Sequence, residues 1–403
     1  MAERLGNLGY FGVIKEVTKG TPLTPTAFVP IYDESMDTDG GFIDQQPIYG
    51  NKAKTYNTVP GQRTHKGDVT ILAEPNTAAI LVDALLTRSN TSGAGPYTHT
   101  FGLDPNTNPH SLTVDISLGN VVKRFWGVEA SKLSPSWNKN ELQLKLSMSA
   151  LGSFRSRDIA TVSTNTITLT DPKGIYNGAP NKGLVAGDLI RLYKSSTGAT
   201  LDTTVTTVNG DGITVVLGTS AAAFAAGDTI QLRPATPSFT LLDSFLWSRT
   251  RFYFGATSTA ALALAATAHT PVEQGSEFEI MHDFNDDGGE ERSGSFDPAS
   301  LVRKTGDANL KVKKYFDTTE DLSNFQNLAK TSCVIRHGAG TFIAGVNQYE
   351  LRIILNNLKT DGKITPGIKA DDVEYSELDY HINYDTSDAA SFSIVVVNNL
   401  ATI

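Results

Sequence analysis

One order of predicted elements occurs twice along this chain of 403 residues, and this repetition constrains the fold more than any single motif. In each occurrence a short alternating strand, residues 67–72 or 308–313, is followed at once by a predicted helix, residues 76–87 or 318–330. A run of segments that alternate between apolar and polar residues follows each helix, which is the pattern of half-buried strands. The repeated order indicates duplication of a β-rich unit that has one helix.

The helices are expected from apolar stripes and from capping residues at their starts. The first is expected to be capped by Asn76 or Thr77, and the second by Thr318 or Thr319. The alternating segments after the helices are residues 112–116, 122–128 and 142–148 in the first occurrence and residues 333–336, 349–355 and 375–384 in the second.

The segment between the two occurrences, residues 156–236, has a different composition and a smaller repeat of its own. It is rich in Thr, Ala and Gly, and the sequence VAGDLIRL at 185–192 returns forty residues later as AAGDTIQL at 225–232. Gly-Asp is a turn dipeptide, and in both places it begins an alternating strand. We therefore expect a small all-β barrel or sandwich, inserted between the duplicated units or into one of them.

These patterns predict three parts: residues 1–155, residues 156–236 and residues 237–403. The length suits two or three domains. The fold class is expected to be mainly β, sandwich-like or barrel-like with few helices, in which each duplicated unit has two packed antiparallel sheets and one flanking helix.

Charge and cysteine content limit the classes of function. Residues 236–403 hold 14 Lys and Arg against 23 Asp and Glu, a difference that equals the net charge of −9 for the whole chain. An acidic surface repels nucleic acid, so sequence-specific DNA binding is not expected, whereas a conduit for DNA is compatible. The single cysteine, Cys333, is expected to be a buried apolar residue, and no segment predicts a signal peptide or a membrane span.

The best candidate for ligand binding is the acidic loop that contains Asp283, Asn285, Asp286 and Asp287. It resembles the opening of an EF-hand calcium loop, but Gly294 stands where the bidentate carboxylate belongs. The two interpretations are a site for adventitious divalent cations and a solvated loop that joins two strands. No catalytic constellation, cofactor motif or paired histidine spacing is evident, so we expect no enzyme, no cofactor and no structural metal.

The order of segments resembles the tail tube subunits of long-tailed phages with non-contractile tails. The resemblance begins at residues 9–16, with the sequence GYFGVIKE, continues through residues 67–70 and 97–101 to Leu151, and returns from Phe278 to Tyr384. It covers most of the chain outside residues 156–236. The resemblance implies a virion protein, assembled in the bacterial host cytoplasm, whose rings stack into a hollow tail through which DNA passes.

The resemblance also implies the partners of the chain. With two tube domains per chain, three copies would complete a ring of pseudo-sixfold symmetry, and six copies are the alternative. Other tail proteins (tape measure, tail terminator and distal tail) would contact the tube, and no membrane is involved. Residues 156–236 would decorate the outer wall, either binding host glycans or stiffening the tube, and the polar loop 37–61 would reach a neighbouring copy and become ordered there.

Two other classes of protein remain open from the sequence. The first is a different phage component, such as a capsid decoration or tail-tip protein, in which residues 156–236 would be a carbohydrate-binding or host-binding domain. The second is a carbohydrate-active or peptide-cleaving enzyme, which would require a carboxylate pair or a nucleophile in a pocket.

Overall fold

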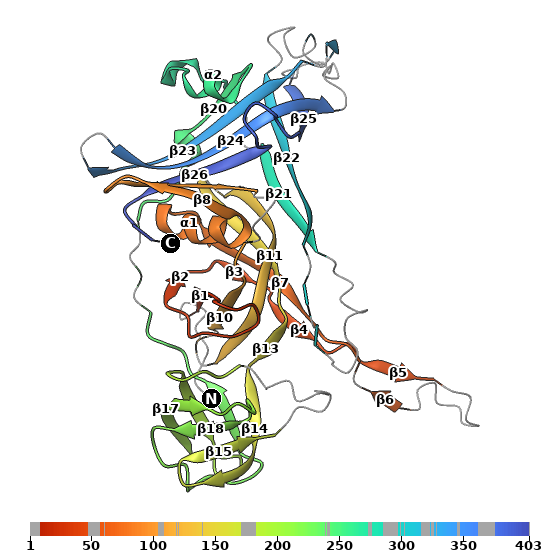
Figure 1. Ribbon diagram of the computed structural model, residues 1–403, viewed down its shortest axis with the longest axis vertical. Coiled ribbons are helices and arrows are strands. Elements are labelled where there is room, and N and C mark those ends of the chain that lie inside the picture. The colour runs from red at the N-terminus through yellow and green to blue at the C-terminus, as the bar shows by residue number, and fades with distance from the viewer. Residues whose placement is uncertain are drawn as a thin grey trace.

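The computed structural model is mainly β, as the sequence predicts (Figure 1). It has a body, a small barrel below the body and a narrow arm at one side. The structure describes residues 9–46, 57–59, 61–103, 109–117, 119, 121–138, 140–170, 183–237, 239, 242–272, 276–284, 297–298, 300–301, 303–315, 323, 326–327, 329–344, 347–361 and 375–402.

The N-terminal half of the body is an antiparallel arrangement that turns around one long strand, β11. The first part of β11 pairs with β10 and β13, and its later part pairs with β12 and with β21 of the other half. The strands of the N-terminal half are β1 (Tyr10–Lys15), β2 (Ala27–Val29), β3 (Asp33–Glu34), β4 (Asp37–Asp39), β7 (Thr64–Leu72), β8 (Thr87–Ser92), β9 (Tyr97–Gly102), β10 (Leu112–Ser117), β11 (Val122–Asn138), β12 (Glu141–Ser149) and β13 (Gly152–Phe154).

The C-terminal half of the body is built around another long strand, β24, which pairs with β23, β25 and β26. The halves are joined where β21 pairs with β11 and where β26 pairs with β9. The strands of the C-terminal half are β20 (Thr250–Gly255), β21 (Glu277–Phe284), β22 (Arg303–Tyr315), β23 (Thr331–Ala344), β24 (Asn347–Asp361), β25 (Tyr375–Ile382) and β26 (Phe392–Asn398), preceded or interrupted by the 3-10 turns η2 (Trp247–Arg249) and η3 (Ala266–Ala268).

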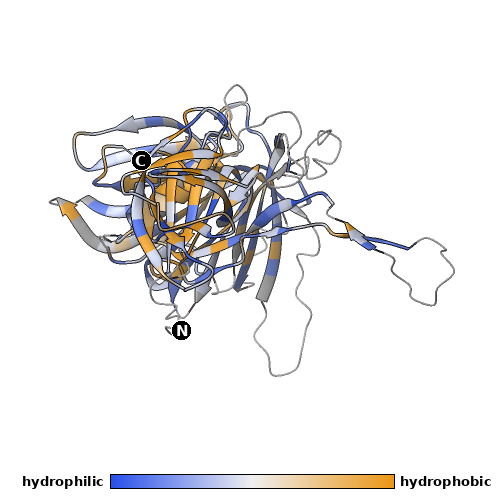
Figure 2. Cartoon of the chain, turned by 90° about the horizontal axis from the view of Figure 1, so that it is seen from below, coloured by the Kyte–Doolittle hydropathy of each residue, from blue (hydrophilic) through white to orange (hydrophobic). Residues whose placement is uncertain are grey.

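Helix α1 (Pro75–Leu85) lies inside the body, packed against β11 on one side and β26 on the other. Because sheets cover it from both sides, the helix is buried nearly all round, and its apolar residues join one core shared by both halves. Figure 2 shows this hydrophobic centre, with hydrophilic residues toward the outside. The predicted first helix is therefore confirmed.

The predicted cap of α1 is wrong. The N-cap is Glu74 rather than Asn76 or Thr77, and the helix begins at Pro75. Proline suits the first helical position because its missing N–H has no partner there in any case. Thr77 acts from inside the helix, where its Oγ1 accepts the N–H of Glu74 at 3.1 Å.

The second predicted helix, residues 318–330, lies mostly outside the described residues; within it Ser323 and Gln326 are helical. The sequence analysis missed the short helix α2 (Ser258–Leu262), which packs on β20 and β23. Its signal was Thr257, whose Oγ1 accepts the N–H of Ala260 at 3.1 Å.

The region between the halves contains a small closed barrel, in agreement with the expected all-β insertion. The order around it is β14-β15-β18-β17-β16-β19. Its strands are β14 (Ser156–Ser163), β15 (Thr166–Leu169), β16 (Leu189–Tyr193), β17 (Thr200–Val208), β18 (Thr214–Leu217) and β19 (Thr229–Leu232).

The two repeated octapeptides begin with the same turn, and their strands β16 and β19 lie side by side in antiparallel register. Gly187 and Gly227 have positive φ angles of 94° and 88°, which glycine adopts without strain. The following aspartates close the turns: Asp188 Oδ2 accepts the N–H of Val185 at 2.8 Å, and Asp228 Oδ2 accepts that of Ala225 at 2.9 Å.

The arm extends β4 and β7 away from the body as the short hairpin of β5 (Ile43–Gln45) and β6 (Asn57–Val59) (Figure 1). The segment that was expected to be a polar loop, residues 37–61, therefore contains short strands among its described residues. Gly41 and Gly61 cross so closely at the root of this hairpin that a Cβ on Gly61 would lie 2.1 Å from the carbonyl oxygen of Gly41. The crossing requires glycine at that position.

Candidate self-assembly surfaces

The buried titratable groups of the body serve packing. Cys333 is fully buried as expected, and burial raises the pKa of its thiol. His337 is also buried: burial lowers its pKa from 6.5 to about 3, and its ring lies 5.3 Å from that of Trp137. His337 is therefore neutral at pH 7, and the His337 Nδ1 atom lies 2.9 Å from Thr250 Oγ1. His337 lines a cavity of only about 20 Å³, which has room for no more than about one water molecule.

A buried ionic cluster holds the barrel to the body. The side chain of Arg124, on β11, is 1% exposed and binds Asp115 with two hydrogen bonds of 2.7 and 2.8 Å. Its remaining guanidinium nitrogen donates to Asp188 of the barrel at 2.6 Å. Burial disfavours the charge of Arg124, but the two carboxylates outweigh it and raise its pKa. Asp188 therefore closes its own turn and also anchors the barrel.

Apolar contacts complete the attachment of the barrel. Val122, Trp126 and Phe154 of the body belong to the same hydrophobic cluster as the barrel core. Thr24 donates to Asp188 at 2.8 Å, and Tyr10 accepts the N–H of Ala235 at 2.9 Å. The barrel is thus held by a packed interface with several polar contacts.

The arm carries the most exposed pair of adjacent large apolar side chains among the described residues. Phe42 is 72% exposed and Ile43 is 56% exposed. Their neighbours on the arm include three acids, Asp37, Asp39 and Asp44. None of the described residues covers this apolar pair, and exposed apolar surface on a projection is typical of a binding site for another protein.

Some strand edges of the body are also open within the described residues. β8 pairs only with β9, and β2 pairs only with β1. The side chains of Arg88, Asn90 and Thr91 on β8 are exposed and polar. Unpaired N–H and C=O groups at such edges are available to a strand from another molecule.

The predicted acidic loop lies largely outside the described residues. Asp283 is in β21, and Asn285, Asp286 and Asp287 are not described. In the described part of the chain no group of three His, Cys, Asp or Glu side chains could hold a metal ion. The prediction that this loop joins two strands agrees with β21 and β22, which pair with each other on either side of it.

Within the described residues, no helix has the length and apolar character needed to cross a membrane. Neither a scan against models of known protein families nor a search of curated proteins finds a match to this chain.

Proposed function

We propose that this chain is the tail tube subunit of a long-tailed phage, a structural virion protein built from two copies of one module. The copies are the N-terminal and C-terminal halves of the body, and the barrel is a decoration between them. Chains assemble into rings, the rings stack, and DNA passes through the resulting channel without specific binding. Three chains per ring give pseudo-sixfold symmetry.

The observation that carries this proposal is that the strand pairing of one half recurs in the other. In the N-terminal half, β10 lies between β1 and β11, and β13 pairs with the first part of β11. In the C-terminal half, β23 lies between β20 and β24, and β26 pairs with the first part of β24. The second part of β11 pairs with β12, and β12 pairs with β7. In the same way, the second part of β24 pairs with β25, and β25 pairs with β22.

The registers of the two halves agree residue by residue at one irregularity. Between β10 and β11 the pairing steps from Leu112↔Val128 to Val114↔Phe125, and between β23 and β24 it steps from Thr331↔Leu358 to Cys333↔Leu355. Each is a bulge with one extra residue on the long strand.

The bulge places equivalent residues in the same unusual backbone conformation. The residue one position before Val128 is Gly127, with a φ of 58°, and the residue one position before Leu358 is Asn357, with a φ of 48°. A shared left-handed residue in a shared bulge is difficult to obtain twice by chance, because few residues adopt positive φ. This agreement supports descent of both halves from one module.

Open edges and the arm support self-assembly of that module. Ring closure pairs exposed strands with neighbouring copies and so removes edges that an isolated chain leaves open. The acidic excess of residues 236–403 suits a channel that DNA crosses without adhering. Contacts with tape measure, terminator and distal tail proteins belong to the same proposal.

The test is the size and symmetry of purified particles. We expect electron micrographs to show rings or tubes, and native mass measurements to give three chains per ring. Six chains per ring would contradict the duplication but would still agree with a tail tube. A single-chain particle at every concentration would refute the tail tube assignment.

A further inference from the structure

The bulge of the N-terminal half is completed by a buried carboxylate. Glu16, the residue after β1, is 4% exposed, and its Oε1 atom accepts the Gly127 N–H at 2.8 Å and the Thr113 hydroxyl at 2.9 Å. Its Oε2 atom accepts the Gly20 N–H at 2.7 Å and the Ser111 hydroxyl at 2.8 Å. Four donors around this bulge thus share one carboxylate.

The strand registers identify the equivalent positions in the C-terminal half. The residue at the register step is Thr113 on β10 and Ser332 on β23. Counting on from the pairs that β1 makes with β10, and β20 with β23, places Thr257 where the N-terminal half has Glu16. Thr257 has no carboxylate, and its Oγ1 accepts the N–H of Ala260 as the N-cap of α2. The C-terminal bulge therefore receives no carboxylate from this position.

An ion pair lies beside the C-terminal bulge. Lys330, at the position equivalent to Ser111, pairs with Asp385 from the turn between β25 and β26. The Asp385 carboxylate also accepts the Ser387 N–H at 2.8 Å. The Ser332 side chain is fully buried, and its hydroxyl has no hydrogen-bond partner among the residues that the structure describes. Asp385 therefore does not serve Ser332 as Glu16 serves the equivalent threonine.

A second buried polar atom lies next to this hydroxyl. Asn356 lies across from Ser332 at the register step between β23 and β24. Both side chains are on the sheet face that α2 covers, because Val334 and Ile354, two positions away on each strand, pack with α2. Asn356 is 3% exposed and its Nδ2 donates to the Ala390 carbonyl at 3.3 Å, but its Oδ1 has no partner in the described part of the chain.

The chemistry of these two atoms selects the ligand. Buried polar groups are nearly always hydrogen-bonded, either to protein or to ordered water. An anion is disfavoured because Asn356 Oδ1 offers only lone pairs. A metal ion would need more ligands, about six to eight oxygens for Ca²⁺. A water molecule can accept the Ser332 hydroxyl and donate to Asn356 Oδ1, and internal waters make about two to four such bonds.

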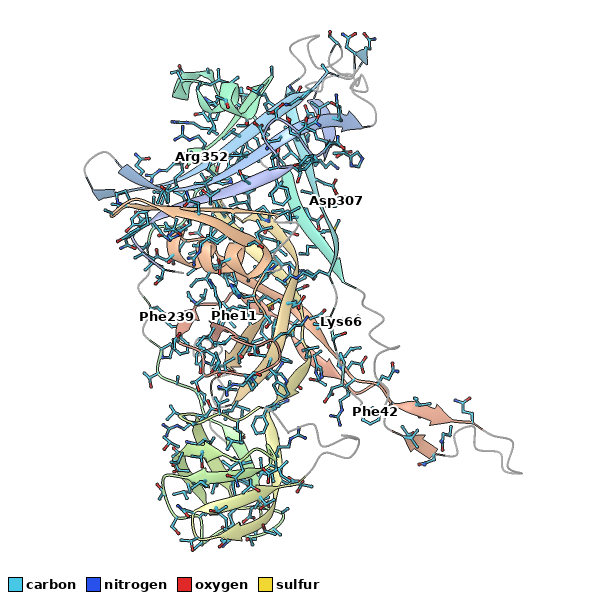
Figure 3. All side chains as sticks on the ribbon, viewed as in Figure 1. Phe11, Phe42, Lys66, Phe239, Asp307 and Arg352 are labelled. Carbon is cyan, nitrogen blue, oxygen red and sulfur yellow. The ribbon has the colours of Figure 1, made fainter. Side chains whose placement is uncertain are left out.

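We propose that an internal water molecule binds between Ser332 and Asn356 beneath α2, where it takes the place of the carboxylate oxygen that Glu16 supplies in the N-terminal half. Figure 3 places Arg352 of β24 at the α2 end of the body and Phe11 of β1 nearer the barrel, so the two bulges lie in separate parts of the body. The same bulge is completed by a side chain in one half and by water in the other. This site does not depend on assembly of the chain.

The direct test is a crystal structure of the full chain at a resolution that shows ordered waters. We expect density for one water within about 2.5–3.0 Å of both Ser332 Oγ and Asn356 Oδ1. A map without density between the two atoms would overturn the proposal. A side-chain rotation that bonds Ser332 Oγ directly to Asn356 Oδ1 would overturn it as well.

The variant Ser332→Ala gives an independent test, because the alternatives predict opposite signs. If the hydroxyl binds water, its removal breaks a hydrogen bond and the urea midpoint of unfolding should fall. If the hydroxyl has no partner, its removal relieves a desolvation cost, so an unchanged or higher midpoint would contradict the proposal. The matched control is Thr113→Val, which removes the equivalent hydroxyl from its bond to Glu16 and should lower the midpoint in either case.

A double-mutant cycle tests whether the two side chains share one water. Ser332→Ala should lower the urea midpoint less in the Asn356→Ala background than in the unmodified chain, because the water has already lost one of its partners there. Equal shifts in the two backgrounds would show that Ser332 and Asn356 bind no common ligand, and the proposal would then be wrong.

Discussion

Equivalent faces of the two halves of the body are covered in different ways. In the N-terminal half the cross-strand pair Asp115–Arg124 binds the barrel. The register places Val334–Ile354 at the same site in the C-terminal half, and there α2 covers them through Ala261 and Leu262. The same position of the sheet thus holds an ion pair that binds the barrel in one half, called the ionic dock below, and an apolar pair that packs against a short helix in the other. Buried ions cost desolvation energy, so we expect these ions to fix the orientation of the barrel more than to add stability.

The largest expected effect comes from removing the guanidinium of the dock. Arg124→Ala leaves Asp115 and Asp188 buried without their cation, and we expect a loss of about 3–5 kcal/mol in the free energy of unfolding. Urea unfolding should show it, and protease cleavage near residue 156 should increase because the barrel is released.

A transplanted pair sharpens this result. The double variant Asp115→Val with Arg124→Ile copies the C-terminal half into the N-terminal half. It should be more stable than Arg124→Ala, because only Asp188 then loses its cation, and that carboxylate keeps its hydrogen bonds from Thr24 and Val185. If the two variants had the same free energy of unfolding, the unpaired carboxylates left by Arg124→Ala would carry no measurable cost.

The two turns of the barrel provide a second comparison. The aspartate of the first turn, Asp188, also binds Arg124 of the body, whereas the aspartate of the second, Asp228, bonds within the barrel. Asp188→Asn removes a charged partner of Arg124 and should cost about 1.5–3 kcal/mol. Asp228→Asn weakens only the bonds to Ala225 and Ser195, so its effect should be smaller. Thermal unfolding of both variants measures the difference. Equal costs would mean that Asp188 does not help to hold the barrel to the body.

A fourth prediction concerns the contact between the halves, where His337 lies against Trp137 of β11. The pKa of His337 is about 3 in the folded chain and 6.5 in the unfolded reference, so the unfolded state binds more protons between these values. Stability is complete above pH 6.5 and falls as the pH drops toward 3, by about 2 kcal/mol between pH 7.5 and 5. His337→Phe should reduce this slope in urea titrations.

The smallest effect should come from the matched bulges. Gly127→Ala adds a Cβ about 2.5 Å from the Leu151 side chain at a positive φ, and should cost about 1–2 kcal/mol. Asn357→Gly occupies the equivalent position without strain and should change stability by less than about 0.5 kcal/mol. A large effect of Asn357→Gly in chemical denaturation would argue against the equivalence of the bulges.

Local periodicity was sufficient to predict most strands and the first helix. Alternation identified the segments that became β7, β12 and β24, because apolar residues gather on the buried face of each. It also identified β10, whose residues alternate between apolar and polar although both of its faces are buried. It did not reveal the length of β11, because this strand has a bulge at Gly127 and pairs with different strands on either side of it, so it keeps no single buried face. The cap of α1 was misassigned because Pro75 and Glu74 were overlooked in favour of polar residues one turn later.

The candidate surfaces were less accessible to sequence reasoning. The Gly-Asp repeat indicated equal turns, but only the fold shows that Arg124 contacts one of them, 64 residues away along the chain. Phe42 and Ile43 looked like ordinary members of a polar loop, since exposure depends on what the rest of the chain covers. The ionic dock and the apolar arm both arise from long-range contacts, or from their absence among the described residues.

The last strand of the body completes the edge of the first half. β26 pairs with β9, and His99 Nε2 lies 3.1 Å from Asn398 Oδ1, which is 299 residues later in the chain. During synthesis on a ribosome, β9 therefore has no partner strand until Asn398, 299 residues after His99, has been added. Under the proposed self-assembly, a nascent chain lacks this finished edge until translation reaches β26, and polymerisation on polysomes is expected to be delayed until then.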